Sequence, residues 1–322
     1  IRSLESGEDR VLVNGRANAE ISAGHLLFWG GNSLMVQPFD EHRLQLRGEA
    51  RPLTDAVRFD STFPFNVQFS AFRERLLAYR TFQPEQTTRL VWYDRQGKQL
   101  GTIGEPALYS NPALSPEGRR LAIGIADPKT GFRDLWTFDL VRGSRSRLTF
   151  DPADESNPVW SPDGSQIAFS SSRRGGRDIY LTRANQGGEE TPVSESSQVK
   201  YLEEWSADGR WLFFHNLDDI YRIPATGVDA KPERVVARLG MQERAHLSPN
   251  REWLAYTSDE SGRLEIYVQA MRPQGGRFQI STEGGTESFW RADGKELFFI
   301  KESALMAVDV KEGPSGLIAG VP

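Results

Sequence analysis

A short pattern that ends in Ser-Pro-Asp-Gly recurs along the chain and constrains its fold more than any other feature. Residues 157–169 read NPVWSPDGSQIAF, and residues 111–123 read the related NPALSPEGRRLAI. The serine position of this signature turn recurs at intervals of 42–48 residues, at Ser22, Ser70, Ser115, Ser161, Ser206, Ser248 and Arg291. A fixed period of this size is typical of propellers and solenoids.

Each repeat divides into four short strands, which we call a to d. Strand a is the apolar pair before the signature turn, such as Val159-Trp160. The turn glycine then supplies the positive φ that a tight hairpin needs. Strand b follows as in Ile167–Phe169, strand c opens with an acidic residue as in Asp178–Tyr180, and strand d is polar, as in Ser146–Thr149. β-Branched and aromatic residues dominate these runs, and no stretch shows the period of an amphipathic helix.

The repeats therefore predict an all-β fold, a β-propeller of four-stranded antiparallel blades that forms a single domain over residues 1–322. Seven signature turns favour seven blades, with six and eight as the alternatives. Residues 1–14 carry no signature turn, so we expect either a strand that closes the last blade or the stump of an upstream blade. Trp160, Trp205 and Trp290 share one repeat position, and we expect all three to be buried between blades.

Composition excludes several classes of partner and site. The net charge of −5 gives the chain no basic field for nucleic acid. The absence of cysteine excludes disulfides, cysteine-ligated zinc and a cysteine nucleophile. No run of 18 apolar residues occurs, so we expect no direct insertion into a membrane. Because the chain begins at Ile1 rather than Met, we interpret it as a piece of a longer product.

The sequence carries no catalytic motif that we can identify. The phosphate loop, strand lysine and catalytic loop of a kinase are missing, and so is the G-x-S-x-G elbow of a serine peptidase. We therefore expect no enzyme activity, no cofactor and no metal. The histidines fall in four different repeats, at His25, His42, His215 and His246. Asp163, Asp208 and Asp293 stand beside turn glycines, where aspartate caps its own backbone.

The remaining candidate for function is the end of the propeller at which strand a begins. A polar residue precedes strand a in six repeats: Asn66, Asn111, Asn157, Glu203, Arg244 and Glu287. We expect these side chains to line one mouth of a central channel, because loops at a blade end are free of packing. The loop between strands b and c opens at the same end and holds the basic cluster Arg173, Arg174 and Arg177. Arginines there could bind an acidic peptide or a phosphate.

The signature turn and its surroundings, from about His25 to Val310, resemble the WD40-like repeat of TolB-type propellers. Finer segments, such as LAYTSDESG at 254–262 and DGKELF at 293–298, resemble the C-terminal propellers of bacterial serine/threonine kinases. In that family a cytoplasmic kinase domain and a membrane span precede the propeller, which lies outside. The resemblance implies a non-catalytic binding and sensing module of a signalling protein, with a protein or peptide partner and a periplasmic or extracellular location.

The sequence leaves two other functions open. A propeller enzyme of the lyase or lactonase type would use the central channel, where it would need a cluster of histidines or carboxylates with a metal. The gating propeller of an S9-type peptidase would need a catalytic domain that this chain does not contain. A cytoplasmic location also stays open.

Overall fold

The residues that the structure describes form strands, turns and loops, with no helix among them. In this computed structural model they are residues 11–13, 19–30, 33–41, 43–54, 59–60, 66–67, 69–72, 76–79, 87–185, 188–194, 199–226, 231–272, 275–313 and 316–322. The chain falls into two compact units. Unit 1 holds the residues up to Thr88 together with Pro106–Leu108 and Ala126–Phe132, and unit 2 holds the others.

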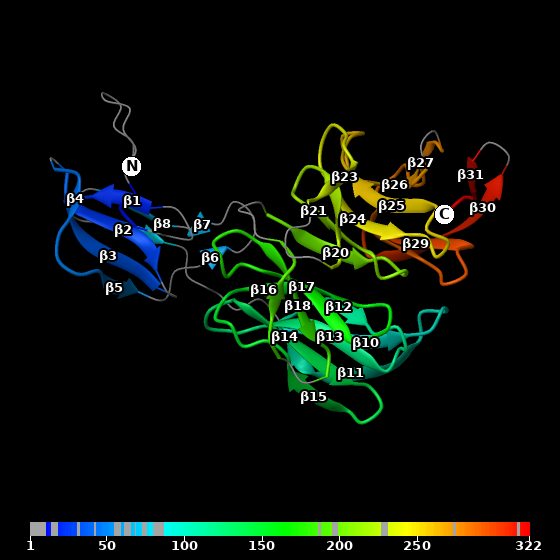
Figure 1. The fold of residues 1–322 in the computed structure, drawn as a ribbon, viewed down its shortest axis with the longest axis horizontal. Helices are drawn as coiled ribbons and strands as arrows, with labels where there is room; N and C mark the ends of the chain where they lie inside the picture. Colours follow the sequence, from blue (N-terminus) through cyan, green and yellow to red (C-terminus); the bar gives the residue numbers. More distant parts are fainter. Residues whose placement is uncertain are drawn as a thin grey trace. The chain divides into compact units, whose positions relative to one another are not determined.

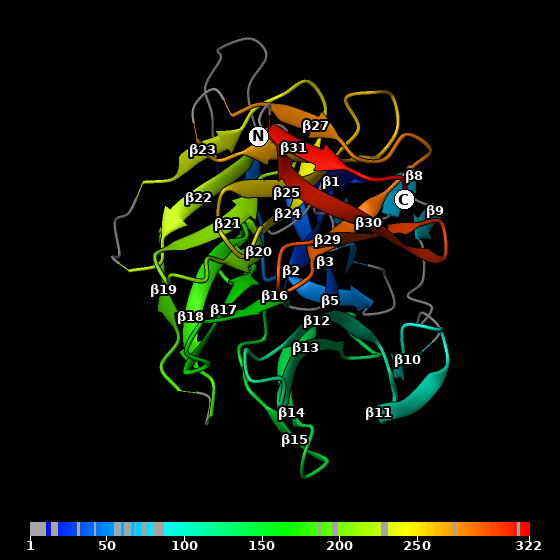
Figure 2. The same cartoon turned by 90° about the vertical axis from the view of Figure 1, so that its right-hand side faces the viewer.

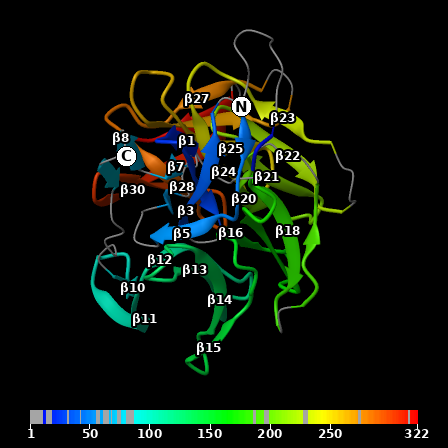
Figure 3. The same ribbon diagram turned by 90° about the vertical axis from the view of Figure 1, so that its left-hand side faces the viewer.

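Unit 1 contains the sheet of the first repeat. β1 (Ala19–Ser22), β2 (His25–Gly30) and β3 (Ser33–Asp40) form an antiparallel meander, and β5 (Arg51–Thr54) pairs with the free edge of β3. Since the β1–β2 turn follows Ser22, this repeat forms a blade as its signature turn predicts. The other pairings are short: β4 (Gln45–Leu46) with β3, β6 (Phe59–Asp60) with β7 (Asn66–Val67), and β8 (Phe69–Phe72) with β9 (Leu76–Tyr79). β8 lies beside β1 (Figure 3).

Unit 2 contains five consecutive four-stranded antiparallel sheets, which we number blade 1 to blade 5. Blade 1 is β12 (Tyr109–Leu114), β13 (Arg120–Ala126), β14 (Arg133–Asp139) and β15 (Ser144–Arg147). Blade 2 is β16 (Glu155–Trp160), β17 (Gln166–Ser171), β18 (Asp178–Arg183) and β19 (Thr191–Pro192). Blade 3 is β20 (Tyr201–Trp205), β21 (Trp211–His215), β22 (Ile220–Pro224) and β23 (Glu233–Val236).

The last two blades follow the same plan. Blade 4 is β24 (Gln242–Leu247), β25 (Trp253–Ser258), β26 (Glu265–Ala270) and β27 (Arg277–Gln279). Blade 5 is β28 (Thr286–Trp290), β29 (Glu296–Lys301), β30 (Ala304–Gly313) and β31 (Gly316–Ala319). A separate pair, β10 (Thr88–Tyr93) and β11 (Gln99–Ala107), precedes blade 1. The first strands of the five blades lie next to one another, and the later strands lie farther out (Figures 1 and 2).

Side chains of the signature turn stabilise it by hydrogen bonds within the turn. In blade 2, Gly164 has a φ of 68°, and Trp160 pairs with Ile167 across the hairpin. The Ser161 hydroxyl accepts a hydrogen bond from the Gln166 amide at 2.9 Å and donates to Asp163 at 2.6 Å. The hydrogen bond from Ser161 lowers the pKa of Asp163 to about 2. The turn aspartate is therefore a capping group, as its place beside glycine predicts.

The core lies between the faces of neighbouring blades. Trp160 and Trp205 are 7% and 9% exposed, which confirms that they pack between blades. Trp290 is half-buried and packs against the apolar cluster of blades 4 and 5. Its indole N–H donates to the His246 carbonyl of the preceding blade at 3.0 Å, and Trp160 donates in the same way to Ala113 at 2.9 Å. At two of the three positions the indole N–H thus links adjacent blades, whereas Trp205 donates to the Gly209 carbonyl of its own blade at 3.1 Å.

The protein is an all-β propeller of four-stranded antiparallel blades. In the described residues five of the seven repeats form such a sheet, and the first repeat forms a five-stranded one. The repeat of Ser70 contributes the two pairs β8–β9 and β10–β11. The fourth strand of blade 5 is β31, which pairs with Val310–Gly313. Residues 1–10 and 14 lie outside the described residues, so the closing strand and the single seven-bladed domain stay predictions.

Candidate binding site at the inner strands

Four of the predicted site residues share an unusual backbone conformation. Asn111, Asn157, Arg244 and Glu287 have φ values of 50°, 54°, 59° and 54°. Each stands in a break of register between the first and second strands of its blade, where the extra residue forms a β-bulge. Asparagine tolerates this left-handed region, whereas arginine and glutamate adopt it at a cost. In these four blades the repeated bulge therefore presents one polar side chain at the same position of the first strand.

These residues line one cavity of about 670 Å³ within unit 2. The first strands of all five blades contribute to it, and it contains five of the six residues predicted ahead of strand a: Asn111, Asn157, Glu203, Arg244 and Glu287. We call it the inner cavity. The sixth, Asn66, lies in β7 of unit 1, opposite Asp60 of β6, and its side chain is outside the described part of the chain.

Glu203 organises the backbone between blades 3 and 4. Its carboxylate accepts hydrogen bonds from the amides of Arg244 and Ala245, the second at 2.9 Å. The same carboxylate lies 2.6 Å from Nδ1 of His215, and both side chains are almost fully buried. The carboxylate oxygens of Glu203 are thus committed to the protein itself. Glu203 positions the bulge at Arg244, whose guanidinium forms an ion pair with Glu287 at 3.2 Å.

Histidines and apolar side chains that the pattern of polar residues did not single out also line the inner cavity. His215 and His246 both border it, although they come from different repeats. His246 lies 3.3 Å from Glu204, and its ring packs on Phe289 with 4.5 Å between ring centres. Phe289 and Leu114 are 50% and 48% exposed. Both are apolar residues of strand a, as the buried Trp160 is, so the sequence carries no signal of their exposure.

The predicted basic cluster is accessible at only one of its three arginines. Arg177 is 0% exposed and forms an ion pair with the buried Asp154 at 2.7 Å. Arg173 forms ion pairs with Glu155 and Glu190, so carboxylates already neutralise it. Only Arg174 of the three is exposed. A guanidinium can be buried only beside a counter-charge, and the loop packs its arginines onto neighbouring strands to obtain one.

Two carboxylates in this region have opposite pKa shifts. Burial alone would raise the pKa of Asp154, but Arg133 and Arg177 lower it to about 2. Burial raises the pKa of Glu155 to about 7, and the negative charge of Glu190 acts in the same direction against Arg173. One oxygen of Glu155 has no hydrogen-bond partner. Asp154 is therefore ionised at neutral pH, whereas Glu155 changes its charge near neutrality.

Over the ranges described above, no group of three or more His, Asp or Glu side chains is placed to hold a metal ion. The strand c acids form ion pairs instead, as in Asp219 with Arg234 at 3.3 Å and Asp178 with Lys200 at 2.5 Å. His25 lies in unit 1, with Nδ1 2.8 Å from the Ala23 carbonyl, and His42 is outside the described residues. The described residues also contain no helix that could span a membrane.

Known proteins share both the sequence pattern and the fold. A TolB homologue of Chlorobium luteolum is 27% identical over 158 residues, which are 47% of this chain and 35% of that protein. An uncharacterised protein of Agrobacterium fabrum is 26% identical over 44% of this chain and 53% of its own length. The chain thus spans about half or less of these relatives. The crystal structure of TolB from Acinetobacter baumannii matches 92% of this chain and 76% of its own, with a TM-score of 0.57 at 16% identity.

The family comparison agrees with the repeat. The signature turns at Ser70, Ser115, Ser161, Ser206 and Ser248 all fall within residues 66–252, which match the TolB beta propeller domain family, PD40. This match covers more than half of the chain. The protein therefore belongs to the family of TolB β-propeller domains.

Proposed function

We propose that this chain is a non-catalytic binding and sensing module that holds a segment of a protein or peptide partner in the inner cavity. The observation that carries the proposal is the composition of that cavity. Side chains of Asn111, Asn157 and Arg244 offer hydrogen bonds, while Leu114 and Phe289 offer exposed apolar surface. A polypeptide segment needs both kinds of contact, because its backbone is polar and its side chains alternate.

The strained bulges support binding at this place. Left-handed φ values for Arg244 and Glu287 cost free energy, and such residues concentrate at sites where geometry serves function. The guanidinium of Arg244 forms one ion pair, with Glu287, and its Nε has no hydrogen-bond partner. The guanidinium as a whole is partly exposed, so it would donate to a carboxylate or carbonyl of a bound peptide.

An enzyme that uses the same cavity is the second candidate, and the pair of His215 and Glu203 is the observation that favours it. Glu203 accepts hydrogen bonds from two backbone amides as well as contacting His215. These contacts hold the imidazole in place but leave the carboxylate little freedom to move a proton. We therefore favour binding over catalysis, and we propose that the module serves a signalling protein outside the cytoplasm.

A photo-crosslinking amino acid at Phe289 tests the site in living bacteria that express the protein. Phe289 is half exposed and borders the inner cavity. Val141, 74% exposed in the turn between β14 and β15, provides the control position. We expect crosslinked protein bands from position 289 but not from position 141, and fewer of them when Arg244 is replaced by Ala. Bands from position 141 alone would contradict the proposal.

The enzymatic alternative is tested separately. We expect the purified chain to show no hydrolase, lyase or lactonase turnover above a His215→Ala control. Turnover that survives repurification and disappears in this variant would favour the enzyme.

A further inference from the structure

An arginine of the chain caps a tryptophan in the joint between blades 1 and 2. The guanidinium of Arg120 lies over the indole of Trp160, 4.5 Å from the ring centre. Its Nη2 donates to the carbonyl of Gly164, the turn glycine of blade 2, at 2.8 Å. Arg120 stands five residues after Ser115, at the start of β13. A cation over an indole face is a favourable electrostatic contact, and the hydrogen bond fixes the plane of the guanidinium.

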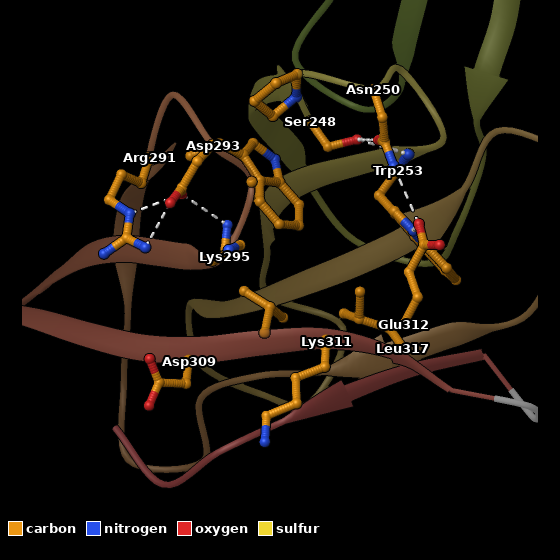
Figure 4. Close-up of a pocket in the computed structure, with 14 residues that line it drawn as sticks. Ser248, Asn250, Trp253, Arg291, Asp293, Lys295, Asp309, Lys311, Glu312 and Leu317 are labelled. Carbon is orange, nitrogen blue, oxygen red and sulfur yellow. Dashed lines mark hydrogen bonds and ion pairs between the residues drawn. The ribbon is translucent and has the colours of Figure 1, made fainter.

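The joint between blades 4 and 5 repeats this geometry without the cation. Trp290 takes the place of Trp160 and donates its indole N–H to the preceding blade in the same way. Gly294, with a φ of 71°, takes the place of Gly164. The residue five positions after Ser248 is Trp253, which donates its own indole N–H to Glu312 at 3.1 Å (Figure 4). Among the described residues, no arginine or lysine lies over Trp290.

The space that Arg120 fills in the first joint is open in the second. A cavity of about 590 Å³ lies there, with Trp253, Trp290, Val310 and Leu317 among its lining residues. The Gly294 carbonyl receives no hydrogen bond from any described residue, whereas that of Gly164 receives one from Arg120.

Asp309 lies at the edge of the cavity. It pairs with Glu296 on β30 next to the buried Val310, so its side chain lies on the opposite face of the strand from Val310, and it forms no ion pair within the described chain (Figure 4). The charged side chains that line the cavity balance in number: Arg291, Lys295 and Lys311 against Asp293, Asp309 and Glu312. Recognition there must depend on shape and hydrogen bonding more than on net charge.

We propose that this cavity binds an arginine side chain of a partner polypeptide. The guanidinium lies on the indole of Trp290 and donates to the Gly294 carbonyl. The chain's own Arg120 shows that the repeat accepts such a group on the equivalent tryptophan. Lysine fits less well, because its ammonium cannot stack flat on the ring while it donates in the ring plane. The site lies at the signature-turn end of the strands, opposite the bulges of the inner cavity, so it is independent of the function proposed above.

The probe is the tripeptide acetyl-Gly-Arg-Gly-amide, titrated into ¹⁵N-labelled protein while the tryptophan indole N–H signals are followed by NMR. We expect the Trp290 signal to shift and the Trp160 signal to stay in place. The lysine peptide should bind about threefold to tenfold more weakly, and the uncharged citrulline peptide more weakly still. Asp309→Asn, on the opposite face of β30, should change the affinity for the arginine peptide by less than about twofold. Equal binding of the citrulline peptide would overturn the proposal.

A gain of binding provides a second test. Replacing Arg120 with Ala uncovers Trp160 and frees the Gly164 carbonyl, so the variant should bind a second arginine peptide and shift the Trp160 signal. Free arginine amide serves as the small-molecule arm. If it binds as tightly as the tripeptide, the site takes a metabolite rather than a polypeptide and the proposal is wrong. A variant that leaves Trp160 insensitive to the peptide would also count against it.

Discussion

Blades 1 to 3 and blades 4 to 5 are built from the same repeat but are joined by different chemistry. At the first junctions, buried charges bridge neighbouring blades. Asp154 of blade 2 binds Arg133 of blade 1 and Arg177 of its own blade, each at 2.7 Å. Asp178 of blade 2 binds Lys200, which leads into blade 3, and both are buried. Between blades 4 and 5 no buried cation joins the described residues: the buried Glu265 accepts hydrogen bonds from Ser281 and from the Gly284 amide, and its ion-pair partner Arg263 is exposed. Most of this joint is an apolar cluster, with Leu297, Phe299 and Trp253 among its members.

The difference shows that the repeat specifies strands and turns but not what fills the joint between blades. A buried ion pair is a poor source of net stability, because desolvation offsets the attraction between the charges. It makes the joint sensitive to the loss of one partner and to pH. An apolar joint depends on volume and shape instead. The two joints should therefore respond differently to substitution.

The largest effect is expected for Asp154→Asn. The substitution leaves Arg177 buried beside Arg133 without their shared counter-charge, which typically costs about 3–5 kcal/mol. Urea denaturation measures the free energy of unfolding, and Asp309→Asn, at an exposed carboxylate, is the control with a change below about 0.5 kcal/mol. Replacing Asp154 with Asn and Arg177 with Met together should recover much of the loss. Similar free energies of unfolding for Asp154→Asn and Asp309→Asn would contradict the proposed role of buried charges in the first joints.

Leu297→Ala should cost about 2–5 kcal/mol in the apolar joint, because it opens a cavity in a fully buried cluster. Leu305→Ala, at a position 69% exposed on β30 of the same blade, should change the free energy of unfolding by less than about 0.5 kcal/mol. The loss at Leu297 should not vary between pH 5 and pH 8. A strong pH dependence of that loss would show that charges contribute to this joint as well.

Glu155 gives the charged joints their own pH dependence. Its pKa is raised from the usual 4.5 to about 7 in the folded protein. Folding therefore favours the protonated carboxyl of Glu155. The stability that this carboxyl contributes is complete below pH 4.5 and is lost as the pH rises through 7. The loss should reach at most about 3 kcal/mol. Glu155→Gln should flatten the stability curve between pH 5 and pH 8 in thermal or urea unfolding, and an unchanged slope would refute the assignment.

The smallest difference is expected between two turn glycines. Gly164→Ala and Gly294→Ala both place a side chain at a φ near 70°, which costs about 1 kcal/mol. A Cβ at Gly164 would also lie 3.1 Å from Glu117 and 3.3 Å from Arg120, whereas at Gly294 the nearest atom is Pro249 at 3.6 Å. Gly164→Ala should therefore be the more destabilising by a few tenths of a kcal/mol. A greater loss in Gly294→Ala would contradict the difference between the two joints, in which Arg120 fills the space beside Gly164 and the space beside Gly294 is open.

Much of the candidate site follows from the repeat alone. The sequence could place four residues together: Asn111, Asn157, Arg244 and Glu287. Each stands the same number of residues before a recognisable turn, and the pairing of the hairpin strands puts this position at the equivalent place in each blade. The bulge that gives them a positive φ was not predictable, since asparagine, arginine and glutamate share no propensity that signals it. His215 was missed for a similar reason, because its contact with Glu203 crosses from one strand to the next.

The sequence by itself determined the blade, its signature turn and the tryptophan that links one blade to the next, because these depend on local turn chemistry and strand alternation. Only the tertiary structure decided which charges are buried. Arg177 looks like a solvated loop residue in the sequence, yet Asp154, 23 residues earlier, removes it from solvent. Burial of a charge depends on a counter-charge from a separate segment of the fold. A local sequence pattern does not show which two segments will come into contact.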